Sequence, residues 1–502
     1  MLSDADLDRL RDRLHAADYT LDPVLARVGP AGRAGLTRNS TMPARDALGD
    51  PAGDDAQATL IRLWVLQDAV ASAAVAAALG EDLHAALLAA RLLEPDADAR
   101  VRAAAPIRPY GAEAGPGSAA VAGWICHDRL PNLDGRSEPL RGDHVLGASP
   151  ASTTLAQLTV RRPVAAALDL GTGCGVQSLH LAGHAGRVVA TDLNPRALDL
   201  ARVSLRLSGV DADLRLGSLY EPVSAETFDL IVSNPPYVMA PPAGAGERLT
   251  YREGALPGDD LVRRVVVDGA RRLAPEGTMQ VLCNWAITAD EPWQERLAGW
   301  LRPTGCDALV LQRERLDPYE YVELWLADAG LDRSPAHAER YRAWLDYLAG
   351  LGVVGVGLGW ISLRNAGRER PDLRLEEWPF DVHQPVGAAF AAQHRAVDLA
   401  ARDDAALLAT RWRVHPGVVQ ETLGRPGAAD PEHLVLRQSF GLGRAVEADT
   451  GLAALVGACD GDLTAAEIVA AIARLLEVDA DALAAELTPR LRALVADGYL
   501  TD

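Results

Sequence analysis

The tetrapeptide Asn-Pro-Pro-Tyr at residues 234–237 follows FDLIV, an apolar run that predicts a buried strand. Neither proline can donate a hydrogen bond to a neighbouring strand, so the strand must end here in a stiff, non-helical turn. Asn234 carries a side-chain amide and Tyr237 carries a flat ring. The turn is therefore a candidate binding site for a small polar group.

A glycine-rich loop lies upstream in AALDLGTGCGVQSL (166–179), where Gly171, Gly173 and Gly175 separate a predicted strand from a predicted helix. Glycines permit positive φ angles and let a ligand approach the backbone, and a helix N-terminus supplies free N–H groups. Val176 occupies the position at which a dinucleotide-binding motif requires its last glycine. The tighter G-x-G-x-G turn suits a nucleoside without a pyrophosphate.

Two further turns follow at the ends of predicted strands. Asp192, in VVATDLNPRA, lies about 20 residues beyond the glycines, where a carboxylate can accept hydrogen bonds from both ribose hydroxyls. Asp192 could equally cap the helix that follows. Ser218 and Leu219, in GSLYEPV (217–223), could contact the edge and the face of a base, or form an ordinary turn.

The elements that must position these loops can be identified from about residue 164 onward. Apolar β-type runs alternate there with helical segments, as in VAAALDL, VVATDL, FDLIVSN, TMQVLCNW and VVGVGLGWISL. This alternation predicts parallel strands with right-handed crossovers, and hence a doubly wound α/β sheet. Ligands of such sheets bind beyond the carboxyl ends of the strands, where all four loops are expected to meet.

Together, the glycine loop, Asp192, the GSL turn and NPPY resemble class I S-adenosylmethionine-dependent methyltransferases over about residues 145–312. The NPPY tetrapeptide is similar to that of members that methylate a nitrogen of a planar amide or aromatic amine. Within that group the chain resembles most the glutamine N-methyltransferases that modify a peptide-release factor. These also have a helical N-terminal domain, a connecting hairpin and a segment similar to RLTYREGALPGDDLVRRVVVDGARRLAPEG (248–277). The resemblance implies a Rossmann-like sheet.

The resemblance also implies roles for individual residues. Asp169 and Gly171 would contact the amino acid part of the cofactor, and the loop GASPASTTLA (147–156) would fold over its methionine end. The residues implied to bind S-adenosyl-L-methionine are Asp169, Gly171, Gly173, Gly175, Asp192, Leu193, Ser218, Leu219, Asn234, Thr153 and Thr154; those implied to act on the acceptor are Asn234, Pro235 and Tyr237. No metal ligand is predicted.

The amide chemistry can also be derived from the residues themselves. An amide NH2 group is a weak nucleophile because its lone pair is delocalised. If the Asn234 side-chain oxygen and the Pro235 carbonyl accept its two hydrogens, the nitrogen is held with its lone pair aimed at a methyl donor. Tyr237 can stack on the planar group and exclude water. No strong base is needed first, because the proton can leave after transfer.

We therefore predict an N-methyltransferase acting on a planar amide nitrogen, either a glutamine side chain of a protein or a small-molecule amide. One alternative is methylation of the exocyclic amine of adenine or guanine in a nucleic acid. The net charge of −20 makes nucleic acid a less favoured partner. A second alternative is a cofactor-binding scaffold without activity, which the intact glycine loop, Asp192 and NPPY disfavour.

Composition excludes several other functions. The 502 residues contain no lysine, which excludes P-loop NTPases and pyridoxal enzymes because both require one. The five cysteines include no C-x-x-C pair, which argues against a zinc cluster or a disulfide framework. The acidic N-terminus MLSDADLDRL and the absence of an apolar stretch of membrane-spanning length predict a cytoplasmic protein without a membrane partner.

The predicted organisation has four parts: a helical N-terminal domain (1–104), a connecting hairpin (105–146), the methyltransferase domain (147–405) with a helical elaboration at 313–350, and a winged-helix-like C-terminal domain (406–502). Residues 411–502 contain 8 Arg but 14 Asp and Glu, so DNA binding is disfavoured for this domain. We expect it to bind a protein or to dimerise.

Overall fold

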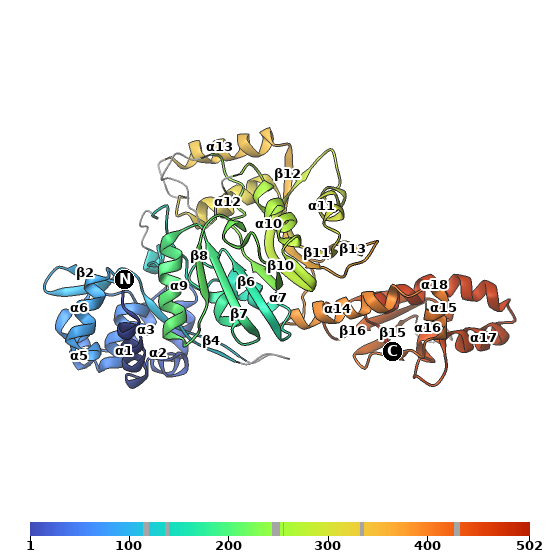
Figure 1. Cartoon of the computed structure of the whole chain (residues 1–502), viewed down its shortest axis with the longest axis horizontal. Coiled ribbons are helices and arrows are strands. Elements are labelled where there is room, and N and C mark those ends of the chain that lie inside the picture. Colours follow the sequence, from blue (N-terminus) through green and yellow to red (C-terminus); the bar gives the residue numbers. More distant parts are fainter. Residues whose placement is uncertain (114–119, 136–139, 243–251, 255, 332–335, 426–431) are drawn as a thin grey trace. The chain divides into compact units, whose positions relative to one another are not determined.

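The computed structural model describes residues 1–113, 120–135, 140–242, 252–254, 256–331, 336–425 and 432–502 (Figure 1). The chain divides into two compact units, residues 1–156 with 162–379, and residues 157–161 with 380–502. The second unit begins before residue 406, where the sequence predicts a C-terminal domain. Its first helix, α14 (Gly387–Ala400), packs against α18 (Ala480–Ala496) and contributes Ala400 to the core of that unit.

An eight-stranded sheet forms the centre of the first unit, in the order β13-β11-β12-β10-β9-β6-β7-β8. The strands are β6 (Val164–Leu170), β7 (Ala185–Asp192), β8 (Asp213–Leu216), β9 (Phe228–Ser233), β10 (Leu273–Thr288), β11 (Asp307–Leu316), β12 (Val353–Arg364) and β13 (Leu373–Glu377). Strands β6 to β10 pair in parallel, which confirms the predicted Rossmann-like α/β sheet. All four predicted loops follow carboxyl ends of these strands.

The sheet is not parallel throughout, so that part of the prediction is wrong. Strand β12 is antiparallel to both of its neighbours, β10 and β11. Its connection from β11 consists of the helices α12 (Pro318–Asp328) and α13 (His337–Gly350). Because β12 is antiparallel to β11, the connection starts and finishes at the same end of these two strands. It therefore does not have to cross over the sheet.

The helices that pack on the sheet include α8 (Val176–Leu181), α9 (Pro195–Leu207), α10 (Asp260–Ala270) and α11 (Trp293–Leu301), in addition to α12 and α13. Asn194 caps α9 by accepting a hydrogen bond from the Arg196 backbone N–H at 3.0 Å, with Pro195 in the first turn. Helices α8 and α9 share one apolar core with the N-terminal region. Helices α10 and α11 share a second core with β9, β10 and β11.

The N-terminal region contains the helices α1 (Asp4–Ala16), α2 (Leu21–Leu36), α3 (Met42–Leu48), α4 (Ala56–Leu60), α5 (Ser72–Leu79) and α6 (Glu81–Ala89). A small sheet, β1 (Val70–Ala71), β3 (Arg100–Ala103) and β2 (Leu93–Asp96), accompanies them. Among the described residues no single helix is long and apolar enough to cross a membrane. The pair α5 and α6 passes that test only jointly and is bent by 116°.

The hairpin of β4 (Ile107–Ala112) and β5 (Val121–Cys126) connects this region to the large sheet. The Cys126 backbone N–H donates to Ser204 Oγ at 2.9 Å, on helix α9. The Tyr110 hydroxyl lies 2.7 Å from His180 Nε2, on helix α8. The hairpin is therefore packed directly on the two helices that follow the glycine loop and Asp192.

The second unit combines a three-stranded antiparallel sheet with helices. Its sheet consists of β15 (Val418–Leu423), β16 (His433–Gln438) and β17 (Ala445–Ala448). Helices α15 (Asp404–Ala409), α16 (Thr450–Gly457), α17 (Ala465–Leu476) and α18 surround a core that includes Trp412, Leu455 and Leu491. The short strands β14 (Arg413–Val414) and β18 (Leu500–Thr501) pair beside them. The two helices on which the winged-helix-like prediction is based correspond to α17 and α18, and the winged-helix-like fold of this unit stays a prediction.

Helix α12 holds the chain that follows NPPY. The buried Tyr321 hydroxyl accepts hydrogen bonds from the Met239 backbone N–H at 2.8 Å and from Asn284 Nδ2 at 3.0 Å. Asp317 and Glu320 form a capping box at the start of the helix, which fixes where Tyr321 lies. The inserted helices therefore belong to the architecture of the candidate site.

Replacing Tyr321 with Phe should destabilise the first unit without changing its fold. The substitution leaves two buried donors, on Met239 and Asn284, without their acceptor, which costs about 1–3 kcal/mol of the free energy of unfolding. Chemical denaturation followed by tryptophan fluorescence measures the loss. Tyr319→Phe, at an exposed position on the same helix, is the control and should leave stability unchanged. Equal stability of Tyr321→Phe and wild type would contradict the assigned role.

Candidate functional site

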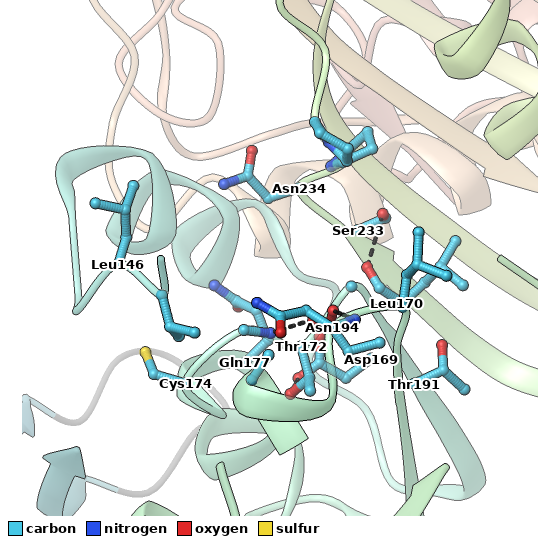
Figure 2. A pocket seen from close by; sticks show the side chains of 18 of the residues that line it. Leu146, Asp169, Leu170, Thr172, Cys174, Gln177, Thr191, Asn194, Ser233 and Asn234 are labelled. Atoms are coloured by element: carbon cyan, nitrogen blue, oxygen red, sulfur yellow. Dashed lines mark hydrogen bonds between the residues drawn. The ribbon is translucent and has the colours of Figure 1, made fainter. Parts of the chain in front are cut away.

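A cavity of about 430 Å³ opens at the carboxyl ends of β6, β7, β8 and β9 (Figure 2). The predicted residues that line it are Asp169, Gly171, Gly173, Asp192, Leu193, Ser218, Leu219, Asn234 and Pro235. Four others do not line it: Gly175, Thr153, Thr154 and Tyr237. The structure thus brings residues from four separate loops around one space of nucleoside size.

The glycine loop has the backbone conformation expected from its sequence. Gly171, Gly173 and Gly175 have φ angles of 76°, 57° and 89°. A Cβ atom built on Gly171 or Gly173 would meet nothing within 4 Å, so the left-handed backbone, and not lack of space, selects glycine there. Gly175 is the N-cap of helix α8 and lies outside the cavity lining.

Asp169, at the end of β6, holds this loop together. Its Oδ2 atom accepts hydrogen bonds from Thr172 Oγ1 at 2.7 Å, from the Ser178 backbone N–H at 3.0 Å and from Ser178 Oγ at 2.7 Å. Burial nevertheless raises the pKa of Asp169 to about 6, because these hydrogen bonds offset only part of the cost of burying the charge. Asp169 therefore shapes the loop as well as lining the cavity.

Asp192, at the end of β7, also binds the backbone of two loops. Its Oδ2 accepts from the Gly173 N–H at 2.9 Å and its Oδ1 from the Asn194 N–H at 2.8 Å. Burial raises the pKa of Asp192, and the backbone hydrogen bonds oppose that shift. The N-cap of helix α9 is Asn194, so Asp192 is not the helix cap. Each carboxylate oxygen retains a lone pair for a ligand.

The turn after β8 is held in an unusual conformation. Leu219 has a φ angle of 47°, in the left-handed region that leucine rarely adopts. The next residue anchors the turn, since the buried Tyr220 hydroxyl donates to the Val265 carbonyl at 2.8 Å. Strain of this kind persists only where the surroundings fix it, and it is common in ligand-binding loops. Ser218 and Leu219 both face the cavity.

Asn234 differs from the other polar residues of the site because its Oδ1 atom is buried without a hydrogen-bond partner in the described structure. The preceding residue fixes its position, since Ser233 Oγ donates to the Leu170 carbonyl at 2.9 Å (Figure 2). Buried polar atoms without partners are rare and each requires an explanation. Asn234 lines the cavity, where a ligand that reached this oxygen could donate the missing hydrogen bond.

Tyr237 lies away from the cavity lining. Its ring packs edge-on against Trp325, with centroids 6.1 Å apart. Burial raises its pKa to about 12. The nearby Arg252 is also buried and donates to the Trp325 carbonyl at 2.9 Å and to Asp328 at 3.0 Å. Tyr237 therefore joins the NPPY segment to helix α12, and Arg252 joins the chain beside Val238 to the same helix.

The loop before β6 contributes residues that sequence reasoning did not identify. Ser149 and Ser152 line the cavity at the start of α7 (Pro150–Leu158), whereas Thr153 is exposed. Gln177 Nε2 donates to the Ser152 carbonyl at 2.8 Å and so ties α7 to the glycine loop. Other lining residues that the sequence did not indicate include Asp143, His144 and Asn194. Of these, only the Asn-Pro pair at 194–195, a common helix start, gives a local signal.

The charge of the cavity restricts its ligand. The acidic residues that line it are Asp143, Asp169, Asp192 and Glu253, and no arginine is among the described lining residues. A site of this charge disfavours phosphates and favours a cationic ligand. Within the described ranges, no group of three or more His, Cys, Asp or Glu residues could hold a metal ion.

Comparisons with known proteins agree with this geometry. Residues 149–297 match the family model described as "Methyltransferase small domain", and residues 16–104 match "Domain of unknown function (DUF7059)". Residues 149–297 therefore form a methyltransferase domain, and the predicted class is confirmed. The domain includes the glycine loop, Asp192, the turn after β8 and NPPY.

Curated relatives that are similar to this chain include the following three. The release factor glutamine methyltransferase of Deinococcus radiodurans is 35% identical over 159 residues, which cover 29% of this chain and 57% of the relative. The ribosomal protein uL3 glutamine methyltransferase of Bradyrhizobium diazoefficiens is 35% identical, covering 33% and 51%, and that of Neisseria gonorrhoeae is 34% identical, covering 30% and 54%. The chain spans about half the length of these curated relatives.

Solved structures are more distant. The YcgJ protein from Bacillus subtilis is 14% identical, with a TM-score of 0.29, and the match covers 43% of this chain and 97% of that protein. A similarity of this size supports no conclusion about ligands.

Asp169 should make stability depend on pH in a defined direction. Because its native pKa of about 6 lies above the ordinary value of 3.8, its contribution to stability is complete below pH 3.8 and is lost as the pH rises through 6. Asp169→Asn removes this titration. The free energy of unfolding of the variant minus that of wild type should therefore increase between pH 4 and 6, by up to roughly 3 kcal/mol.

Chemical denaturation of both proteins over that pH range measures this difference. Hydrogen bonds lost in the variant add an offset that does not change with pH, so only the slope is informative. A difference that is constant from pH 4 to 7 would contradict a raised pKa for Asp169.

Proposed function

We propose that this protein is an S-adenosylmethionine-dependent N-methyltransferase that acts on a planar amide nitrogen, namely a glutamine side chain of a protein. The observation that supports the proposal is that Asn234, which lines the cavity, has a buried Oδ1 atom without a hydrogen-bond partner among the described residues. An acceptor NH2 group supplies the donor that this oxygen lacks.

The cavity residues fit S-adenosylmethionine. This cofactor carries a sulfonium and an ammonium group and has no phosphate, in agreement with lining carboxylates and the lack of a lining arginine among the described residues. Asp169 and the glycine loop would hold its amino acid part, Asp192 and Leu193 its ribose, and Ser218 and Leu219 its adenine. When bound, the cofactor supplies an electrophilic methyl group.

The chain's own residues then need only to bind and orient the amide. Asn234 Oδ1 accepts one N–H of the acceptor and the Pro235 carbonyl accepts the other, which fixes the plane of the amide and the direction of the nitrogen lone pair. The prolines at 235 and 236 restrict the backbone, so this geometry exists before the acceptor binds. Tyr237 supports the corner through its contact with Trp325.

A protein acceptor is favoured over nucleic acid. The net charge of −20 opposes binding to a phosphate backbone, and the three relatives are named as methyltransferases of glutamine in a release factor or in ribosomal protein uL3. With an acceptor of that kind, we infer that the reaction takes place in the cytoplasm. We assign the C-terminal unit to contact with a protein partner or a second copy of the chain.

Asn234→Ala should separate binding from turnover. The variant should bind S-adenosylmethionine within about threefold of wild type, because Asn234 holds the acceptor, while kcat should fall by roughly 10²–10³-fold, as for loss of one oriented polar group in other active sites. Calorimetry and single-turnover assays measure the two effects. Asp192→Ala should do the reverse and weaken cofactor binding first.

Asn365→Ala is the matched control for the loss of an asparagine. Its Nδ2 donates to the Leu273 and Ala274 carbonyls at 3.1 Å and 3.2 Å, away from the cavity. This variant should retain both cofactor affinity and kcat. If Asn234→Ala lost cofactor binding as severely as Asp192→Ala, the role assigned to Asn234 would be wrong.

The acceptor class can be tested with methyl-labelled cofactor and a cell lysate, incubated with and without nuclease. We expect label in a protein fraction that survives nuclease, and mass spectrometry should locate the methyl group on a glutamine. Purified release factor and ribosomal protein uL3 are the first acceptors to compare. Label that disappears with nuclease would instead support the base methyltransferase alternative, and cofactor binding without any labelled product would support a scaffold.

A further inference from the structure

One part of the cavity lining is formed by residues 143–147, which we call the roof loop. All five residues line the cavity, although they precede the region 149–297 that matches the methyltransferase family. The roof loop contains no local motif, such as the glycine loop or NPPY, that would fix its backbone. Its position therefore depends on contacts with other segments.

Asp128, just after the hairpin, makes the closest of these contacts. Its backbone N–H donates to the Val145 carbonyl at 3.0 Å, and its Oδ2 accepts from the Val145 N–H at 2.8 Å. The neighbouring ring of His127 lies under the roof loop, since a Cβ atom added to Gly147 would approach it at 2.8 Å. Residues 127 and 128 therefore support the middle and the end of the loop.

The same carboxylate binds the start of helix α9. Arg196 Nε donates to both Asp128 oxygens at 3.0 Å, and its Nη2 contacts Oδ1. The Asp128 side chain is only 7% exposed. Arg196 follows the cap residue Asn194, whose backbone N–H donates to Asp192 and whose Nδ2 donates to the Asp143 carbonyl at 2.9 Å. Asp128 is thus connected to Asp192 through Arg196 and Asn194, and to the roof loop through Val145.

We propose that Asp128 is a positioning residue for the cofactor: it fixes the roof loop and the Asp192–Arg196 turn in one arrangement and so determines cofactor affinity without touching the cofactor. This inference rests on the proposed function. Asp128 does not line the cavity, and its contacts extend the cofactor site into the segment that links the hairpin to the methyltransferase domain.

The physical reason is that two loops share one buried charge. Without the carboxylate, the Val145 N–H loses its acceptor and the Arg196 guanidinium loses its counter-ion. Both loops then populate other conformations. The apparent Kd of a ligand rises in inverse proportion to the fraction of molecules that hold the binding arrangement.

Asp128→Asn tests the proposal by calorimetry with S-adenosylmethionine. We expect the Kd to rise about tenfold or more, as for a binding arrangement populated in a tenth of the molecules, and KM for the cofactor to rise with kcat at saturating cofactor nearly unchanged. In the cofactor-free protein, amide hydrogen exchange at Val145 to Gly147 should become faster. If Asp128 served stability alone, the substitution would lower the free energy of unfolding without a specific change in the cofactor Kd, in KM or in the exchange rates of the roof loop.

Asp54→Asn is the matched control. Asp54 forms a similarly buried pair with Arg62 at 2.6 Å, with side chains 8% and 6% exposed, and neither residue lines the cavity. The control should lose stability but retain the cofactor Kd and the exchange rates of the roof loop. An equal rise in Kd in both variants would show that general destabilisation is the cause, and the proposal would be wrong.

Arg196→Gln and Gly147→Ala perturb the same arrangement from other residues, so the test remains available if Asp128→Asn does not fold. The rise in Kd for Asp128→Asn combined with Arg196→Gln should be smaller than the product of the two single effects, because they share one contact. Independent effects would overturn the shared role.

If wild type bound no cofactor, the proposed function would fail, whereas unchanged Kd and exchange in Asp128→Asn would reject only this inference.

Discussion

The site depends on two carboxylates at the ends of adjacent parallel strands, the buried Asp169 and the half-buried Asp192, for which the described residues supply no basic partner. Asp169 and Asp192 receive hydrogen bonds almost entirely from the backbone and hydroxyls of the loops that they organise. Burial of such charges is costly, which is why the pKa of each lies above its ordinary value. The free-energy cost of burying these charges falls at the carboxyl ends of the strands, where a cationic ligand could offset it.

The sequence predicts best those residues whose local chemistry allows few alternatives. Positive φ angles demand glycine at 171 and 173, and two consecutive prolines end a strand in any context, so the glycine loop and Asn234 were identified and line the cavity. Asp192 was ambiguous from its own neighbours alone. The structure decides this point because Asn194, two residues later, occupies the cap position.

The sequence predicts less well whatever depends on tertiary packing. Thr153 and Thr154 lie on the helix next to the cavity but do not line it, because helix orientation decides which side chains do so. Tyr237 packs on Trp325, a residue 88 positions away that no local pattern connects to it. The roof loop and the antiparallel direction of β12 likewise follow from contacts between distant segments.

The insertion of α12 and α13 between two antiparallel neighbours has a consequence for how this chain can diversify. Since the insert starts and finishes at the same end of β11 and β12, it can be lengthened or exchanged without shifting the register of any strand. Its side chains contact Tyr237 and the Met239 backbone, whereas the loops after β6, β7, β8 and β9 contribute most of the cavity lining. The insert can therefore change while the loops that line the cavity stay as they are.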